Sequence, residues 1–291
     1  RRQRQMCIRD SDERRAEAAK HLALMKGAFA KETQATIDAA VVYEDGDALA
    51  LELPEPTAEA TETQVTTDFT TTALRRAQGK TAIVDPVSYT RPGGAYEDGS
   101  FGPEQILCSE SNLYPVLCGM KSTYHDQNRS YMCGMLLTSR AMYLPNVVFI
   151  REGEIREASV IAVPEPNRER ALENHRSERE CLDCLAARIE TMFNIAAANE
   201  IETLIVNAYA CGRQGFQPAQ VIELFQQWIA AHPGAIKTIV FAVPRASFDA
   251  FDEAFGQPAP VVEEVVAPAE EQEDDEFDFR AIDLPEGITI R

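Results

Sequence analysis

Two adjacent glycines, followed ten positions later by an acidic residue, form the part of this 291-residue chain best suited to chemistry. The stretch reads Arg91-Pro92-Gly93-Gly94-Ala95 and, after seven more residues, Pro103-Glu104-Gln105. Adjacent glycines let the backbone take positive φ values and bring its N–H groups against a ligand. Pro103 suits the first position of a helix, which puts Glu104 in the first turn beside the loop. By local rules alone, the same pattern also describes an ordinary turn and a surface glutamate favoured by the helix dipole.

A second glycine-rich loop lies far along the chain and reads Cys211-Gly212-Arg213-Gln214-Gly215-Phe216. It follows a Val/Ile-rich run at 203–208. A guanidinium in such a loop suits a phosphate group, because it donates two parallel hydrogen bonds. The alternative for Arg213 is a solvated loop arginine, which exposure statistics favour equally.

Other patterns that could do chemistry are weaker. Cys181 and Cys184 form a Cys-x-x-Cys pair inside a predicted helix, but no second pair stands at zinc-like spacing. The four histidines are isolated from one another. We find no Walker, Gly-x-Ser-x-Gly or Gly-x-Gly-x-x-Gly motif. The sequence therefore predicts neither a metal site nor a cofactor.

The elements that must position the two loops alternate between strands and helices. Short Val/Ile-rich runs predict strands at 81–87, 147–151, 159–163, 203–208 and 238–243. Helical patterns cover 12–39, 168–199, 218–231 and 246–255, and another helix is expected to begin near residue 103. A strand pair is expected at 41–53, and a loop or the capped start of a helix at 54–72. This alternation predicts an α/β sheet covered on both faces, with ligands beyond the carboxyl ends of the strands.

Composition excludes several classes of function. The chain carries 28 basic and 47 acidic residues, a net charge of −19. Generic nucleic-acid binding and membrane-surface binding are therefore poor expectations, since both draw on clustered Lys and Arg. No run of 18 apolar residues predicts a membrane span, and no apolar segment behind the N-terminal arginines predicts a secretory signal. Seven cysteines are too few for a disulfide scaffold, so we expect the protein to be located in the reducing cytoplasm.

Both ends of the chain differ in composition from its middle. Residues 1–11 lack an apolar period, and we interpret them as an assembly scar. Residues 257–291 hold eleven acidic residues against two arginines, which predicts a disordered acidic tail whose partner is unknown.

The motifs resemble those of the microbial-type poly(ADP-ribose) glycohydrolases, a branch of the macrodomain fold. The family has three glycines, a spacer of six to eight residues, and Gln-Glu-Glu opening a helix that continues with Leu-Cys and Ser-x-Leu-Tyr. Here Leu107-Cys108 and Ser111-Asn112-Leu113-Tyr114 set the register without a gap. Further similar segments lie at 29–33, 160–167 and 207–218, so the resemblance covers about residues 14–255.

This chain departs from the family at the positions that carry the chemistry. The catalytic acid of the family is the second Glu of Gln-Glu-Glu, and Gln105 stands in its place. A carboxamide can donate a hydrogen bond but cannot give up a proton at neutral pH. Further departures are Asp85 for an Asn that binds the distal ribose, Ala95 for the third glycine, Pro103 for the Gln, and Gln214 where an aromatic residue is common. The charge of Asp85 would repel phosphate unless Arg91 or Arg213 compensates.

The resemblance implies a three-layer α/β/α macrodomain at 12–256, with an N-terminal helical extension and a mixed sheet covered by helices on both faces. It implies hydrolysis of the ribose–ribose O-glycosidic bonds of ADP-ribosyl chains, with activity reduced by Gln105 and with Glu104 as the best remaining acid. A catalytically inactive ADP-ribose reader is the alternative, and a scaffold that binds no nucleotide is a third. The partner would be ADP-ribose or an ADP-ribosylated protein. The ligand-binding residues implied are Asp85, Gly93, Gly94, Ala95, Cys211, Gly212, Arg213, Gln214, Gly215 and Phe216.

Overall fold

A seven-stranded mixed sheet organises the computed structural model, which describes residues 2–256. The predicted acidic tail at 257–291 lies outside the described residues. In spatial order the strands are β1 (Val41–Tyr43), β4 (Ala141–Arg151), β5 (Glu154–Ala162), β3 (Thr81–Asp85), β6 (Thr203–Val206), β7 (Thr238–Ala242) and β2 (Glu62–Thr66). The five strands from β5 to β2 are parallel, β4 is antiparallel to β5, and β1 is antiparallel to β4. Parallel strands end at the same edge of a sheet, here called the carboxyl edge.

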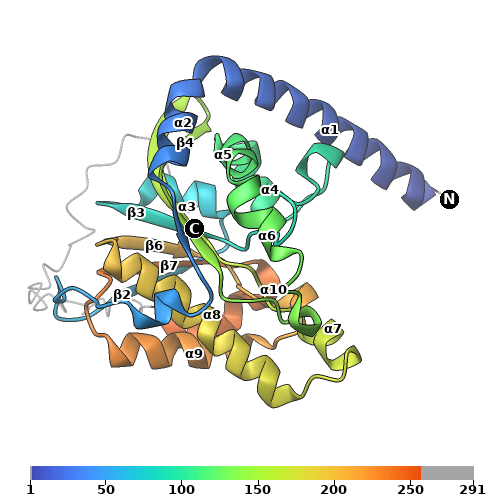
Figure 1. The fold of residues 1–291 in the computed structure, drawn as a ribbon. Coiled ribbons are helices and arrows are strands. Elements are labelled where there is room, and N and C mark those ends of the chain that lie inside the picture. Colours follow the sequence, from blue (N-terminus) through green and yellow to red (C-terminus); the bar gives the residue numbers. More distant parts are fainter. Residues whose placement is uncertain (1, 257–291) are drawn as a thin grey trace, which may run out of the picture. The chain divides into compact units, whose positions relative to one another are not determined.

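Helices cover both faces of the sheet, as expected (Figure 1). One face carries α8 (Glu178–Ala198), α9 (Pro218–Ala231) and α10 (Arg245–Phe255). The other carries α3 (Thr70–Arg76), α4 (Pro103–Ser109) and α5 (Leu113–Gly119), with α1 (Arg2–Ala28) and α2 (Ala30–Ala39) packed beside them. The short helices α6 (Asp126–Asn128) and α7 (Arg168–Glu173) lie in the connections. The predicted α/β/α fold class is confirmed.

Apolar side chains explain why the two layers hold to the sheet. Every residue of β3 is buried, and its alternate side chains join the two opposite cores. On the α8 face, the Phe193 ring stacks on Trp228 with centroids 4.8 Å apart, and Phe241 stacks on Phe255 at 4.3 Å. Buried aromatic side chains contribute large apolar areas, so this face forms a well-packed base beneath the loops.

The order of helices and strands follows the sequence predictions, with a few local differences. The helix expected at 12–39 breaks near Phe29 into α1 and α2, and residues 2–11 continue α1. The helix expected at 168–199 is two helices, because Ser177 forms a capping box with Glu180 and starts α8 anew.

Two predictions for the segment between residues 41 and 72 are wrong. The strand pair at 41–53 is a single strand, β1, followed by a 3₁₀ turn, η1 (Asp47–Ala50), and β1 pairs with β4. The segment at 54–72, predicted as a loop or the capped start of a helix, contains the edge strand β2, and helix α3 begins only at its end, at Thr70. This strand reads Glu-Thr-Gln-Val-Thr and is only partly buried, so it lacks the apolar run by which the other strands were predicted.

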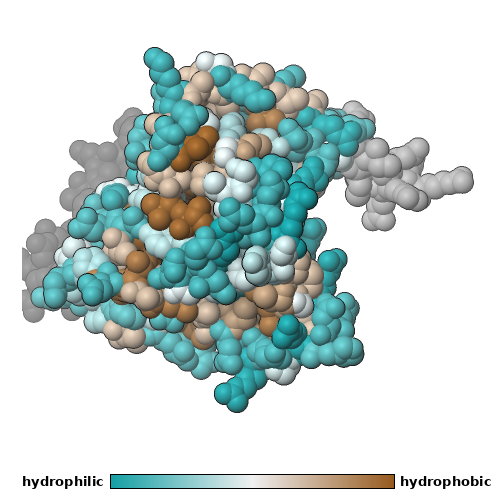
Figure 2. All heavy atoms as spheres, in the orientation of Figure 1, coloured by the Kyte–Doolittle hydropathy of each residue, from teal (hydrophilic) through white to brown (hydrophobic). Residues whose placement is uncertain are grey.

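The surface of the face shown in Figure 2 is largely hydrophilic, and its hydrophobic side chains form separate groups. The most exposed large apolar residues include Phe101 and Ile155, at 60% and 63% exposure. Within residues 2–256, no helix is both long and apolar enough to cross a membrane.

Candidate functional site

Three neighbouring parallel strands bring polar side chains together at the carboxyl edge. Asp85 is the last residue of β3, Asn207 follows β6, and Glu165 lies three residues after β5. The loop after β3 leads to α4 and brings a fourth polar residue, Glu104, to the same edge. These four side chains define the candidate site.

Asp85 is completely buried, and neither of its carboxyl oxygens has a hydrogen-bond partner among the described residues. Burial, followed by the charge of Glu165, raises the pKa of Asp85 to about 8. At neutral pH the group therefore holds a proton for most of the time. Unsatisfied buried oxygens are costly, so this position favours a ligand that supplies hydrogen-bond donors.

Glu104 is 4% exposed and points into the site from the first turn of α4. Its Oε2 accepts a hydrogen bond from the backbone N–H of Ser88 at 3.1 Å, whereas Oε1 has no partner within the described part of the chain. Burial, and then the nearby charge of Asp85, raise the pKa of Glu104 well above its usual value. The structure thus brings together two carboxyl groups, Asp85 and Glu104, that both retain protons under conditions where carboxyls are normally ionised.

The first glycine loop closes over α4 because its glycines have no side chains. Gly93 and Gly94 have φ values of +63° and +58°. A Cβ atom on Gly93 would lie 2.5 Å from the Tyr114 ring, and one on Gly94 would lie 2.9 Å from Gln105 Nε2 and 3.3 Å from Glu104 Oε2. Both positions therefore require glycine, because a Cβ atom would clash with the neighbouring side chains and because the φ angle is positive. Ala95, at the position of the third family glycine, has φ −107° and needs no such freedom.

Gln105, the residue after Glu104, binds the first glycine loop to α4. Its Nε2 donates a hydrogen bond to the carbonyl of Gly93 at 3.0 Å. Its side chain also lines a separate cleft of about 360 Å³ between α1 and α4, together with His21, Tyr96 and Ile106. One step along a helix rotates the side chain by about 100°, which explains why Glu104 and Gln105 face different surroundings.

The second glycine loop, residues 211–216, lies against the segment that follows β5. Glu165 accepts hydrogen bonds from the backbone N–H of Ala210 at 2.7 Å and from Gln214 Nε2 at 2.9 Å. Burial raises the pKa of Glu165 to about 7. The two hydrogen bonds act in the opposite direction and lower the pKa, but their effect is smaller. Gln214 thus contacts Glu165.

The other predicted residues of this loop have different surroundings. Gly212 and Arg213 are exposed, and Gly212 and Gly215 have φ values of +68° and +87°. Cys211 is half-buried, which raises the pKa of its thiol to about 12. The Phe216 side chain is 2% exposed and packs in the core on the α8 face.

Neither Arg91 nor Arg213 pairs with the Asp85 carboxyl. Arg91 forms an exposed ion pair with Asp98 at 2.9 Å, and Arg213 is exposed to solvent. Burial keeps the Asp85 carboxyl largely protonated. The negative charge that was expected at this position to repel phosphate is therefore mostly absent at neutral pH.

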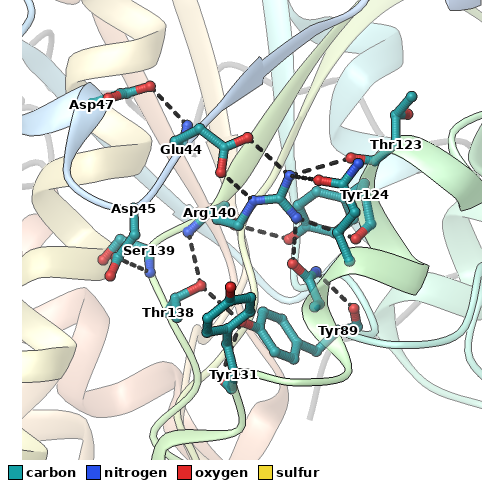
Figure 3. Close-up of polar contacts among 12 residues, drawn as sticks. Glu44, Asp45, Asp47, Tyr89, Thr123, Tyr124, Tyr131, Thr138, Ser139 and Arg140 are labelled. Atoms are coloured by element: carbon teal, nitrogen blue, oxygen red, sulfur yellow. Dashed lines mark hydrogen bonds and ion pairs between the residues drawn. The ribbon is translucent and has the colours of Figure 1, made fainter.

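A buried arginine supports the loop that carries Ser88 (Figure 3). Arg140 is 5% exposed and donates to both carboxyl oxygens of Glu44, at 2.7 and 3.0 Å, and to Asn128 Oδ1 at 2.5 Å. Asn128 in turn donates to the backbone carbonyl of Tyr89 at 2.8 Å. The Tyr89 hydroxyl hydrogen-bonds Thr138 at 2.7 Å. The network therefore fixes the residue next to Ser88, and so the N–H group that binds Glu104.

Sequence reasoning missed Glu165, whose place in the site depends on the order of the strands. The available signal was a Pro-Glu-Pro turn directly after a predicted buried strand, at the edge where ligands are expected. Among residues 2–256, no group of three or more His, Cys, Asp or Glu is arranged to hold a metal ion.

Comparison with known proteins agrees with this architecture. The family description "Microbial-type PARG, catalytic domain" matches residues 15–152, which include β3, the first glycine loop and α4. PARG denotes poly(ADP-ribose) glycohydrolase. No curated protein matches this chain in sequence.

Solved structures of bacterial poly(ADP-ribose) glycohydrolases share the fold. The enzyme of Thermomonospora curvata is 25% identical, with a TM-score of 0.73 over 84% of this chain and 98% of that one. The same enzyme bound to the inhibitor ADP-HPD gives a TM-score of 0.71 over the same shares at 25% identity. The enzyme of Deinococcus radiodurans in complex with ADP-ribose is 23% identical, with a TM-score of 0.69 over 76% of this chain and 96% of that one.

Proposed function

We propose that this chain is a member of the microbial-type poly(ADP-ribose) glycohydrolase family and hydrolyses the ribose–ribose O-glycosidic bonds of ADP-ribosyl chains with Glu104 as the general acid. The observation that carries the proposal is the buried Glu104 carboxyl, which keeps its proton beside Asp85 and leaves Oε1 without a partner in the described part of the chain.

Cleavage of a glycosidic bond requires an acid that protonates the leaving oxygen as positive charge develops on the sugar. An ordinary glutamate is ionised at pH 7 and cannot fill this role. Burial raises the pKa of the Glu104 carboxyl well above its usual value, so a proton on this carboxyl is available to the leaving oxygen. Once it has given up that proton, the Glu104 carboxylate accepts one from the attacking water.

Asp85 and Gln105 orient the reacting groups in this proposal. A ribose hydroxyl supplies the hydrogen-bond donor that the Asp85 oxygens lack within residues 2–256. Gln105 holds the Gly93 carbonyl and so keeps the loop closed over α4. Because Glu104 reaches the bond from a different side of the helix, we expect a slower enzyme than a relative with glutamate at position 105.

The test is release of ADP-ribose from poly(ADP-ribosyl)ated protein by the full chain. We expect Glu104→Gln to lower the rate by about 10² to 10⁴, the usual effect of losing a general acid. The matched control is Asp98→Asn, which removes an exposed carboxyl of the same loop and should leave the rate unchanged. Equal rates for Glu104→Gln and the unaltered chain would refute the assignment of the acid.

If the unaltered chain releases nothing but binds free ADP-ribose in calorimetry, the alternative of an inactive reader replaces the hydrolase. The proposals of a cytoplasmic location and of a partner for the acidic segment rest on composition alone.

A further inference from the structure

The second glycine loop and the two residues before it form hydrogen bonds with the segment after β5. The Tyr209 hydroxyl donates to the Pro164 carbonyl at 2.7 Å, and Arg168 Nη1 donates to the Gly215 carbonyl at 3.1 Å. Between these two contacts, the Glu165 carboxyl binds both Ala210 and Gln214. Glu165 therefore occupies the centre of the contact.

The groups that hold Glu165 are suited to an oxyanion. Ala210 has φ +60°, in the left-handed region that a residue with a side chain seldom adopts. This turn directs the Ala210 N–H towards Oε1 of Glu165. The Ala210 N–H and the Gln214 amide converge on the two oxygens of one carboxyl. A phosphate oxygen could use the same two donors.

The segment that carries Glu165 also starts beside the buried Asp85, because Asp85 pairs with Ala162 and its carbonyl accepts a hydrogen bond from the Val163 N–H at 2.9 Å. Asp85 has two oxygens with no hydrogen-bond partner among the residues described. The carboxyl that fills the oxyanion position is thus part of the candidate site.

We infer that the Glu165 carboxyl competes with the phosphate oxygens of the ligand for Ala210 N–H and Gln214, and so sets how tightly a diphosphate binds. The inference rests on the proposed function, because it concerns binding of the ADP-ribosyl diphosphate. A phosphate group that binds here must displace the Glu165 carboxyl, and until it does so the two negative groups repel each other. Glu165 therefore weakens the binding of diphosphate ligands.

The experiment is calorimetric titration of the full chain with ADP-ribose and, separately, with inorganic pyrophosphate. We expect Glu165→Ala to lower both Kd values by about tenfold, because it frees two donors and removes a charge. Glu165→Gln removes the charge but keeps a polar group in place, so we expect a smaller decrease, about threefold. The matched control is Glu169→Gln, an acidic neighbour that packs against Gly215 without binding either donor, and it should leave both Kd values unchanged.

Pyrophosphate separates failure of the inference from failure of the proposed function. Tighter pyrophosphate binding by Glu165→Ala with no ADP-ribose binding by any variant would support the inference and overturn the function. Unchanged or weaker pyrophosphate binding by both folded Glu165 variants would overturn the inference. If Glu165→Ala does not fold, Glu165→Gln decides alone, and a pyrophosphate Kd equal to that of the unaltered chain would overturn the inference.

Discussion

Asp85→Asn is expected to change how the stability of the fold depends on pH. The folded chain keeps a proton on Asp85 up to about pH 8, whereas an unfolded aspartate loses it near pH 4. Between these values the native state binds the extra proton, so the free energy of unfolding falls as pH rises. The stabilisation linked to Asp85 is fully present below about pH 4 and is lost as pH rises towards 8.

The change in the free energy of unfolding depends on how much more of one proton the folded state binds than the unfolded state does. One proton corresponds to at most about 1.4 kcal/mol per pH unit, so between pH 5 and pH 8 the unaltered chain loses at most about 4 kcal/mol through Asp85. Asparagine has a similar shape and does not titrate. Asp85→Asn should therefore be more stable than the unaltered chain at pH 8, by about 1 to 4 kcal/mol, with a smaller difference at pH 5.

Urea unfolding of both proteins at pH 5, 6.5 and 8 measures this difference. Asp98→Asn is the control, since Asp98 lies on the surface in a pair with Arg91, and its curve should parallel that of the unaltered chain. If Asp85→Asn shows the same pH dependence as the unaltered chain, Asp85 does not keep a proton in the folded state. The reasoning on the carboxyl pair would then be refuted.

Two further predictions concern residues that support the site. Arg140→Leu leaves the partners of a buried guanidinium unpaired and should lower the free energy of unfolding in urea by about 2 to 4 kcal/mol; a loss below about 0.5 kcal/mol would contradict the role given to this network. Gly94→Ala places a Cβ 2.9 Å from Gln105 Nε2 and 3.3 Å from Glu104 Oε2, so ADP-ribose release should slow by about tenfold or more in a folded protein. Its control is Gly153→Ala, which has the same kind of backbone angle but open space around the Cβ; equal rates for the two variants would argue against a close approach at Gly94.

The sequence predicted the parts of the molecule that depend on local patterns. Val/Ile-rich runs predicted β3, β6 and β7 to within one or two residues. The start of α4 was predicted because Pro103 is compatible with only the first turn of a helix. Strand β2 was missed because an edge strand with one open side needs no apolar run.

Part of the site was also predictable, because some of its residues belong to a local sequence pattern. Its glycines and Glu104 belong to one continuous stretch, and the motif spacing located them. Glu165 reaches the site only because β5 lies beside β3, a pairing between residues about 75 positions apart that no local pattern encodes. Likewise, the protonated state of Asp85 arises from complete burial and from the charge of Glu165, which depend on tertiary packing.

The measurement that tests the central claim most directly compares ADP-ribose release from poly(ADP-ribosyl)ated protein by the unaltered chain and by Gln105→Glu. The account assigns the proton to Glu104, so it predicts release by the unaltered chain and release at least as fast by Gln105→Glu. No release by the unaltered chain together with release by Gln105→Glu would contradict it. That result would show a pocket that binds ADP-ribosyl groups and lacks its acid.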